Sequence, residues 1–270
     1  TLITSRGCPF HCTYCSKSVF GSKYRAMTPQ RVCDEIKLLI DNYKVREIHF
    51  YDDDFTMDMK RAETISEEIV KQGIKICWSC TTRVDLVEEG LLYKMKRAGC
   101  WLISYGVESG NAEILKKAEK RYSLEQISKS FNLTKRTGIR TLAYFMLGLQ
   151  GETKETIEET IGFSLKLNPD FVSWGITSLY PGSRLYQNAQ DGELGGKIIP
   201  GNTQRNGPGT GKNKAWHGSA SPYGDGFAII HEENLSREEL EEYGREANKR
   251  FYLRPLYLLK FLFKISSLNQ

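Results

Sequence analysis

The sequence predicts an α/β protein, a partial (β/α)6 barrel of the TIM-like kind with a C-terminal helical extension. Short apolar, β-branched stretches alternate with amphipathic helical ones, which is typical of a parallel sheet built from βα units. Successive strands end roughly thirty or more residues apart, the length of a βαβ unit, and right-handed crossovers curl such a series into a barrel. In that architecture the chemistry lies at the carboxyl ends of the strands.

Six strands are predicted along the first two thirds of the chain. In order they are Leu2–Thr4, Glu47–Tyr51, Lys75–Thr81, Leu102–Val107, Arg140–Leu147 and Phe171–Ser178.

Capping residues mark the helices between the strands. Thr28, Ser123 and Thr153 stand where a hydroxyl oxygen can accept from the first unpaired backbone N–H groups of a helix. Gly138 ends the second of these helices, and Pro169 follows the third. Each helix has an apolar face at the spacing that packs on a sheet.

The composition changes after the sixth strand, so we expect three regions. Residues 1–180 form the core barrel, 181–235 a Gly-rich loop or insertion, and 236–270 the helical extension. The Gly-, Asn-, Ser- and Lys-rich part of the insertion is predicted to be a lid over the substrate or a partly disordered segment. Ser236 with Glu239 predicts a capping box for the first helix of the extension.

Length and composition exclude several classes of protein. The chain has 270 residues, 40% of them hydrophobic and 26% charged, so it can bury a sizeable core. A net charge of +5 does not demand a polyanion partner. No apolar run is long enough for a membrane span, and no signal peptide is visible, so we expect a soluble protein. The chain opens on Thr1 inside a predicted strand, so we expect a piece of a longer protein.

The seven cysteines predict a reducing, cytoplasmic setting, because an odd number does not make a disulfide framework. Four of them are scattered among apolar residues, where free cysteine behaves as a small buried hydrophobe, and are therefore predicted to be buried. They are Cys33, Cys77, Cys80 and Cys100.

The other three cysteines crowd into the stretch TSRGCPFHCTYC, directly after the first predicted strand. Cys8, Cys12 and Cys15 can converge on one point, and soft thiolates favour zinc, copper or iron–sulfur clusters. Three thiolates leave one position open, as a catalytic site would. A zinc site completed by His11 or a distant cysteine is one alternative, and chance clustering is another. We favour a [4Fe–4S] cluster with one iron free.

The C-x3-C-x2-C spacing, with Tyr14 before the third cysteine, resembles the signature of radical S-adenosylmethionine (SAM) enzymes. The resemblance covers Thr1 to about Tyr180. Three further motifs at predicted strand ends support it, namely FYDDDFT (50–56), YGVESG (105–110) and FMLGLQGET (145–153). The third has Gln150 where the family usually has proline, which affects the shape of that turn.

The resemblance implies a radical SAM TIM-like barrel and a set of site residues. The three cysteines would bind three irons, and the fourth iron would chelate the amino and carboxylate groups of SAM. Reductive cleavage of SAM would then give methionine and a 5′-deoxyadenosyl radical that takes hydrogen from the substrate. The cofactor-binding residues implied are Tyr14, Asp52, Asp53, Asp54, Glu108, Ser109 and Gly148.

Other readings of these residues stay open. The acidic run formed by Asp52, Asp53 and Asp54 could be a solvated surface or a magnesium site. Glu108 could make a structural hydrogen bond. Arg83 could bind a carboxylate of SAM or substrate bidentately, or could pair with Asp85 instead.

Within the family, SRGCPFHCTYCSKSVFGSKYR, FYDDDFT and RFYLRPLYLLK most resemble the cobalamin-associated branch. That branch includes methylases of unactivated carbons and the magnesium-protoporphyrin ester cyclase, and its members carry a cobalamin-binding domain before the barrel. Cobalamin is therefore expected only through a domain that these residues do not include. The alternatives are a tRNA methylthiotransferase-like enzyme and a non-catalytic iron–sulfur module.

The resemblance also implies partners. We expect an electron donor such as flavodoxin or ferredoxin, and a small-molecule, lipid or porphyrin-like substrate; a nucleic-acid substrate is disfavoured by the helical ending. No acidic residue follows Glu246, and basic residues there alternate with Phe, Tyr and Leu. This C-terminal basic helix either packs on the barrel or contacts an anionic membrane surface peripherally.

Overall fold

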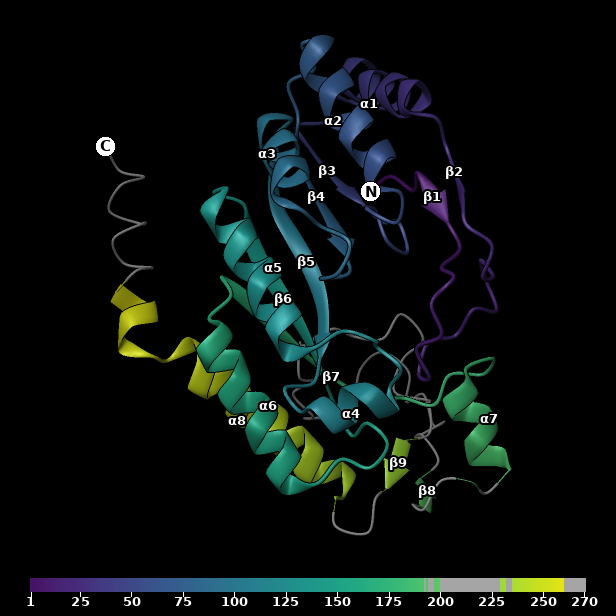
Figure 1. The fold of residues 1–270 in the computed structure, drawn as a ribbon, viewed down its shortest axis with the longest axis vertical. Coiled ribbons are helices and arrows are strands. Elements are labelled where there is room, and N and C mark those ends of the chain that lie inside the picture. The colour runs from purple at the N-terminus through teal and green to yellow at the C-terminus, as the bar shows by residue number, and fades with distance from the viewer. Residues whose placement is uncertain (192, 194–196, 200–228, 232–234, 260–270) are drawn as a thin grey trace, which may run out of the picture.

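The structure is a computed structural model that describes residues 1–191, 193, 197–199, 229–231 and 235–259. Its centre is a parallel sheet in the order β3-β4-β5-β6-β7, so the α/β class and the partial barrel are confirmed. Helices line one side of this sheet, and the N-terminal segment lies on the other (Figure 1). The five strands are Glu47–Phe50, Cys77–Thr82, Cys100–Glu108, Arg140–Leu147 and Phe171–Ile176.

The helices form where the capping residues predict. Thr28, Ser123 and Thr153 each accept from a backbone N–H of the first turn of their helix. Helices α1 to α6 span Pro29–Tyr43, Met59–Lys71, Glu89–Arg97, Ala112–Lys117, Leu124–Arg136 and Lys154–Leu167. None of the described helices has the length and apolar character needed to cross a bilayer.

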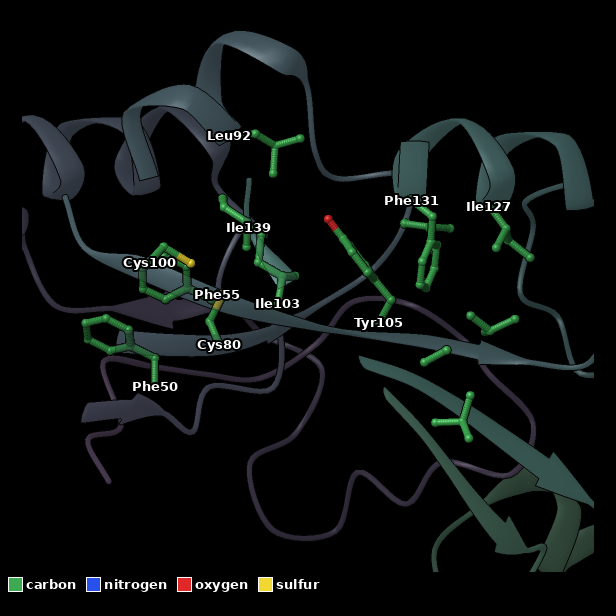
Figure 2. Close-up of a cluster of buried hydrophobic side chains, with 14 of the residues drawn as sticks. Phe50, Phe55, Cys80, Leu92, Cys100, Ile103, Tyr105, Ile127, Phe131 and Ile139 are labelled. Carbon is green, nitrogen blue, oxygen red and sulfur yellow. The ribbon is translucent and has the colours of Figure 1, made fainter. Parts of the chain in front are cut away.

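The core lies between the sheet and these helices. Strand β6 buries every second residue and leaves the intervening ones partly exposed on the inner face of the sheet. Figure 2 shows Phe50 and Phe55 beside Cys80 and Cys100, and the two phenyl rings stack at a centroid distance of 4.7 Å. The layer of helices therefore leaves the inner face and the carboxyl edge of the sheet for the site.

The prediction that all four scattered cysteines are buried is wrong for one of them. Cys33, Cys80 and Cys100 are buried, but Cys77 is exposed. Cys77 is the first residue of β4, at the amino edge of the sheet, where the helices no longer cover the strand.

The first predicted strand, Leu2–Thr4, is reduced to a single parallel bridge between Leu2 and Phe50. The next residues form β1 (Ser5–Arg6), which pairs antiparallel with β2 (Arg25–Ala26). The cause is a side chain that replaces a backbone partner: the N–H of Thr4 donates to the carboxylate of Asp52 at 2.6 Å instead of extending the ladder.

The expected loop region 181–235 contains regular structure that the sequence did not predict. Arg184–Gln190 forms helix α7, and β8 (Lys197–Ile199) pairs antiparallel with β9 (Ile229–His231). The lid or disordered segment predicted for most of this region lies outside the described residues.

The helical extension begins as predicted and packs on the barrel. The Ser236–Glu239 capping box starts α8 (Arg237–Tyr252), and residues 255–259 are helical again. Arg250 pairs with Glu158 of α6 at 2.7 Å, and Arg254 donates to the carbonyl of Leu165 at 3.3 Å. Two of the basic residues on which the membrane contact depends, Lys260 and Lys264, lie outside the described residues, so that contact stays a prediction.

Candidate active site

The three cysteines lie on a loop between β1 and β2, beyond the carboxyl edge of β3. The loop folds back on itself: the N–H of Cys8 donates to the carbonyl of Gly21, and that of Cys15 to Cys12. Gly7 has φ +89°, and a Cβ there would lie 2.1 Å from the carbonyl oxygen of Lys23. Only glycine fits this close approach, so Gly7 fixes the turn that presents Cys8.

The three thiols lie close enough to affect one another electrostatically. Cys15 is exposed as a residue, but the surrounding loop partly desolvates its sulfur; this desolvation, with the neighbouring Cys12 and Cys8 adding to it, raises the pKa of Cys15 to about 11. Burial also raises the pKa of Cys8, and Lys17 acts in the opposite direction on both thiols. Such a trio becomes a set of thiolates only beside a strongly positive partner, which a metal centre supplies.

This donor set fits an iron–sulfur cluster. It consists of three soft sulfurs, and a cubane binds each of them through a different iron. The described residues contain no group of three or more His, Cys, Asp or Glu side chains arranged to hold one metal ion. A cubane does not need that tight grouping, because its ligands surround a cluster of four irons.

Two residues of the acidic run fasten the cysteine loop. The buried carboxylate of Asp52 accepts from the N–H of Thr4 at 2.6 Å, from its hydroxyl at 2.6 Å and from the Ser5 hydroxyl at 2.7 Å. The exposed Asp53 accepts from the N–H of Gly7 at 2.6 Å. These contacts make Asp52 and Asp53 supports of the loop, and the SAM contacts implied for them stay predictions.

Asp54 differs from its two neighbours. It is 2% exposed; its Oδ1 accepts from the Thr82 hydroxyl at 2.6 Å, while its Oδ2 has no hydrogen-bond partner among the described residues. Burial raises the pKa of Asp54 to about 6. A buried carboxylate oxygen without a donor is costly, so Asp54 is the member of the run that is ready to accept from a bound cation such as an ammonium group.

Replacing Asp52 by Asn is expected to loosen the cysteine loop before it affects anything else. The change removes the charge from three hydrogen bonds, and we expect about 2 kcal/mol of lost stability together with poorer iron retention after gel filtration. Asp53→Asn is the matched control, because it weakens a single exposed contact. Equal iron retention in the two variants would contradict the assignment.

Glu108 ends β5 and forms a buried ion pair that the sequence did not reveal. Its backbone is left-handed, with φ +68°, and its carboxylate lies 2.8 Å from the ammonium of Lys120. A Cβ on Gly106 would lie 2.5 Å from the Glu108 Oε1, so the glycine leaves room for the pair. Burial lowers the pKa of Lys120, but the facing Glu108 and other groups outweigh it and hold that pKa well above its usual value.

Lys120 is the functional candidate that sequence reasoning missed. It follows α4 in a run of charged residues, KKAEKR, in which nothing distinguishes one cation from the next. Only the fold turns Lys120 inward, through left-handed backbone at Glu119 and Arg121. Its ammonium lies 5.6 Å from the ring centroid of Tyr14, which places it beside the cysteine loop.

Arg83 makes the second of the two pairings considered for it. Its guanidinium donates to both oxygens of Asp85, at 2.9 and 2.8 Å, and to the carbonyl of Lys120 at 2.9 Å. It also stacks on the ring of Phe10, 3.6 Å from the centroid. Arg83 therefore ties the end of β4 to the cysteine loop and to the segment after α4.

The remaining predicted residues take different places. Tyr14 packs on Leu179 and Leu185, a small hydrophobic cluster beneath the loop. Ser109 is fully buried, and its hydroxyl lies 3.0 Å from the Thr160 hydroxyl of α6. The structure thus uses the Ser109 side chain between β5 and α6, and its contact with SAM stays a prediction.

Gly148 lies in the turn after β6, which Glu152 organises. Glu152 is 1% exposed; its Oε2 accepts from the N–H of Gly148 at 2.5 Å and from that of Leu149 at 3.3 Å. Gly148 has φ +77°, and a Cβ there would meet Leu240 of α8 at 2.9 Å. Gly148 is therefore also a contact point for the C-terminal helix, and its role in binding SAM stays a prediction.

Glu152 predicts a pH dependence of stability. Burial raises the pKa of this carboxyl from 4.5 to about 8. The folded protein favours the protonated form of Glu152. This stabilises the fold fully at pH values below the pKa of the unfolded state, and the stabilisation is lost as the pH rises through about 8. Between about pH 5 and about pH 8, the wild type should lose stability relative to Glu152→Gln, by at most about 1.4 kcal/mol per pH unit.

Urea unfolding across this pH range tests the assignment. Glu155→Gln, in the exposed first turn of α6 just after Glu152, is the control and should leave the wild-type pH profile unchanged over the same range. Parallel profiles for the wild type and Glu152→Gln would show that Glu152 is ionised throughout, contrary to the expectation.

Helix α7 and the segment after α4 complete the support of the cysteine loop. The N–H of Leu185 donates to the carbonyl of Thr13 at 2.9 Å, and the N–H of Thr13 donates to Ala118 at 3.2 Å. In Figure 1 the end of the N-terminal loop accordingly lies beside α7 and α4. The loop is thus held from the ends of several strands, as expected of an active site at the carboxyl edge of a barrel.

Fold and site together define a class: a partial α/β barrel that holds a three-cysteine loop over the carboxyl ends of its strands. The chain belongs to the radical SAM superfamily, whose family model matches residues 2–164. This family uses a [4Fe–4S] cluster and SAM, so both cofactors and the enzymatic class predicted from the motifs are confirmed.

Two relatives match more than two thirds of this chain. An uncharacterized methyltransferase of Pyrococcus horikoshii is 32% identical over 264 residues, which cover 97% of this chain and 53% of that protein. The anaerobic magnesium-protoporphyrin IX monomethyl ester cyclase of Rubrivivax gelatinosus is 35% identical over 196 residues, which cover 72% of this chain and 34% of that protein. The chain therefore spans about half the length of the first relative and a third of the second.

A solved structure shares the fold. The radical SAM methyltransferase TsrM from Kitasatospora setae, solved with cobalamin and a [4Fe–4S] cluster bound, superposes with a TM-score of 0.72. The match covers 90% of this chain and 51% of TsrM at 18% identity. At that identity the comparison shows a common fold.

Proposed function

We propose that this chain is the catalytic barrel of a cobalamin-associated radical SAM enzyme that methylates or cyclises a substrate at an unactivated carbon. The observation that carries the proposal is that the three-cysteine loop is held next to Asp54: the N–H of Gly7, beside Cys8, donates to Asp53, and the buried Oδ2 of Asp54 has no hydrogen-bond partner among the described residues. The magnesium-protoporphyrin cyclase and the methyltransferase among the relatives support the reaction class.

Each part of the site has a task in this proposal. Cys8, Cys12 and Cys15 would hold the cluster, which together with SAM supplies one-electron cleavage of a carbon–sulfur bond and hydrogen abstraction from carbon. Asp54 would accept from the ammonium group of SAM. The Glu108–Lys120 pair offers both signs of charge beside the loop, which suits a zwitterionic amino acid moiety.

The substrate and the use of cobalamin belong to the whole protein. A porphyrin-like or lipid-like substrate is supported by the names of the relatives, which include a hopanoid C-3 methylase of Methylococcus capsulatus, 29% identical over 182 residues. Cobalamin would bind through a domain outside this chain. The TsrM structure supports this, because it shares the fold of this chain, which covers 51% of TsrM, and was solved with cobalamin bound.

Anaerobic reconstitution tests the function directly. The protein is loaded with iron and sulfide, reduced with dithionite in the presence of SAM, and assayed for 5′-deoxyadenosine. Cleavage of SAM supports the proposal; zinc in place of iron, or intact SAM after reduction, would end it. Corrinoid analysis of the full-length protein then tests the cobalamin part separately, and thiolated tRNA as product would identify the RNA-modifying alternative.

A further inference from the structure

We propose that the outer surface of the cysteine loop is the docking surface for an acidic electron-carrier protein. This surface, called the donor face below, consists of Arg6, Lys17, Val19, Lys23 and Arg25. The inference rests on the proposed function, because only a cluster that takes up electrons one at a time needs such a carrier. It adds where on the chain the carrier binds and which residues attract it.

The donor face is strongly and uniformly basic. The segment from Arg6 to Arg25 contains four lysine or arginine residues and no aspartate or glutamate. Arg6, Lys23 and Arg25 are exposed and Lys17 is half-buried, and none of the four makes an ion pair with any other described residue. Their charges are therefore available to a partner.

The carboxylates that approach this loop do not neutralise it. Asp53 accepts from the backbone N–H of Gly7, and Glu119 lies 2.5 Å from the guanidinium of Arg184. Both acids are thus engaged in holding the loop in place. Asp53 keeps its negative charge, whereas Arg184 balances that of Glu119, so the four basic residues still outnumber the unbalanced carboxylate.

The donor face lies next to the site where the electron must arrive. Lys17 follows Cys15 by two residues, and Gly21 connects its backbone to that of Cys8: the N–H of Gly21 donates to the carbonyl of Lys17 at 2.9 Å, and the carbonyl of Gly21 accepts from the N–H of Cys8 at 3.3 Å. Cys15 itself is exposed. In Figure 1 the upper part of the loop between β1 and β2 runs along one edge of the drawn ribbon, and its lower end lies beside α7. A carrier that docks there can bring its own redox group close to the cluster.

An exposed apolar residue completes the surface. Val19 is 69% exposed, between the basic residues on either side in the chain. An apolar contact within a charged rim is typical of protein interfaces, and a small rim-dominated patch suits the weak, transient encounters of redox partners. Opposite charge on the carrier would steer the encounter and raise its rate, with a strong dependence on ionic strength.

The proposed step is the transfer of one electron from the carrier to the cluster. One electron leaves the reduced carrier and one is gained at the cluster, and the protein forms or breaks no bond. The same basic surface could attract a nucleic acid, but a reductive enzyme with an exposed cluster ligand at this place favours the carrier. Nucleic-acid binding is therefore an outcome of the test and not a second proposal.

Stopped-flow reduction of the reconstituted protein tests the donor face. The probe is a reduced acidic flavodoxin, and the readout is the bleaching of the cluster absorbance, which does not depend on turnover. Lys17→Glu combined with Lys23→Glu should slow the second-order reduction by about tenfold or more at low salt. Reduction by a small neutral photoreductant should stay unchanged.

A matched variant separates local from overall charge. Lys44→Glu with Lys75→Glu changes the net charge equally, but both residues precede strands β3 and β4 at the opposite end of the sheet. Reduction of this control by flavodoxin should match the wild type. Equal slowing of both double variants would overturn the proposal, as would tRNA binding that falls in the donor-face variant while flavodoxin reduction does not.

Two further measurements keep the test decisive. If the first variant fails to take up iron, Arg6→Glu combined with Lys23→Glu is used instead. It leaves Lys17, two residues after Cys15, unchanged, and it should slow the reduction by flavodoxin to the same extent. In the wild type, the flavodoxin rate should fall steeply as salt is added; a rate independent of salt would exclude electrostatic docking. SAM cleavage with dithionite tests the proposed function independently, so the failure of either idea can be told from the failure of the other.

Discussion

Replacing Cys12 by serine is expected to remove the cluster and SAM cleavage together. Loss of a residue that only supports a metal ligand commonly costs 10–100-fold, so loss of a ligand itself should lower cleavage by more than about a hundredfold. Iron bound after reconstitution should fall in parallel. The measurements are iron content, the absorbance of the cluster and the yield of 5′-deoxyadenosine.

Cys77→Ser is the matched control for this prediction. Cys77 is another free cysteine, and it is exposed at the amino edge of the sheet, away from the cysteine loop. Its replacement should leave iron content and cleavage as they are in the wild type. A Cys12→Ser protein that retained the wild-type iron content would show that the loop does not hold the cluster.

Lys120→Met is expected to cause the largest loss of stability among single substitutions near the site. The ammonium of Lys120 and the carboxylate of Glu108 are 7% and 8% exposed and lie 2.8 Å apart. Removing one partner leaves the other charge buried and unpaired, which costs about 3–5 kcal/mol. The free energy of unfolding, measured in urea near neutral pH, should fall by that amount.

Two further variants make this prediction specific. Lys116→Met, on α4 close by, breaks an exposed pair with Glu113 and should cost less than about 1 kcal/mol. Lys120→Met combined with Glu108→Gln removes both charges and should recover much of the loss, because no unpaired charge remains. A Lys120→Met protein no less stable than Lys116→Met would mean that the pair does not form.

Much of the fold could be predicted because its signals are local. The hydroxyl caps at Thr28, Ser123 and Thr153 act within one turn of helix, and each helix begins beside its cap. The alternation of strands and helices gives the parallel sheet for the same reason. Prediction failed where a side chain took the place of a backbone partner: the N–H of Thr4 donates to the carboxylate of Asp52, 48 residues away, and not to a neighbouring strand.

The candidate site shows the same division. The spacing of Cys8, Cys12 and Cys15 identifies the cysteine loop by itself, because all three ligands lie within a short stretch of chain. The sequence could not divide the acidic run into two supports and one carboxyl with an unpartnered oxygen. Neighbours in sequence face different surroundings there, and those surroundings come from other strands.

By itself, the sequence determined the class of this protein: the βα alternation, the three-cysteine loop and the motifs at the strand ends. Only the tertiary structure decided that Lys120 pairs with Glu108, that Arg83 pairs with Asp85, and that α7 supports the cysteine loop. The physical reason is the distance along the chain over which each feature is determined. Periodicity and ligand spacing are properties of adjacent residues, whereas burial and charge pairing depend on which segments the fold brings together.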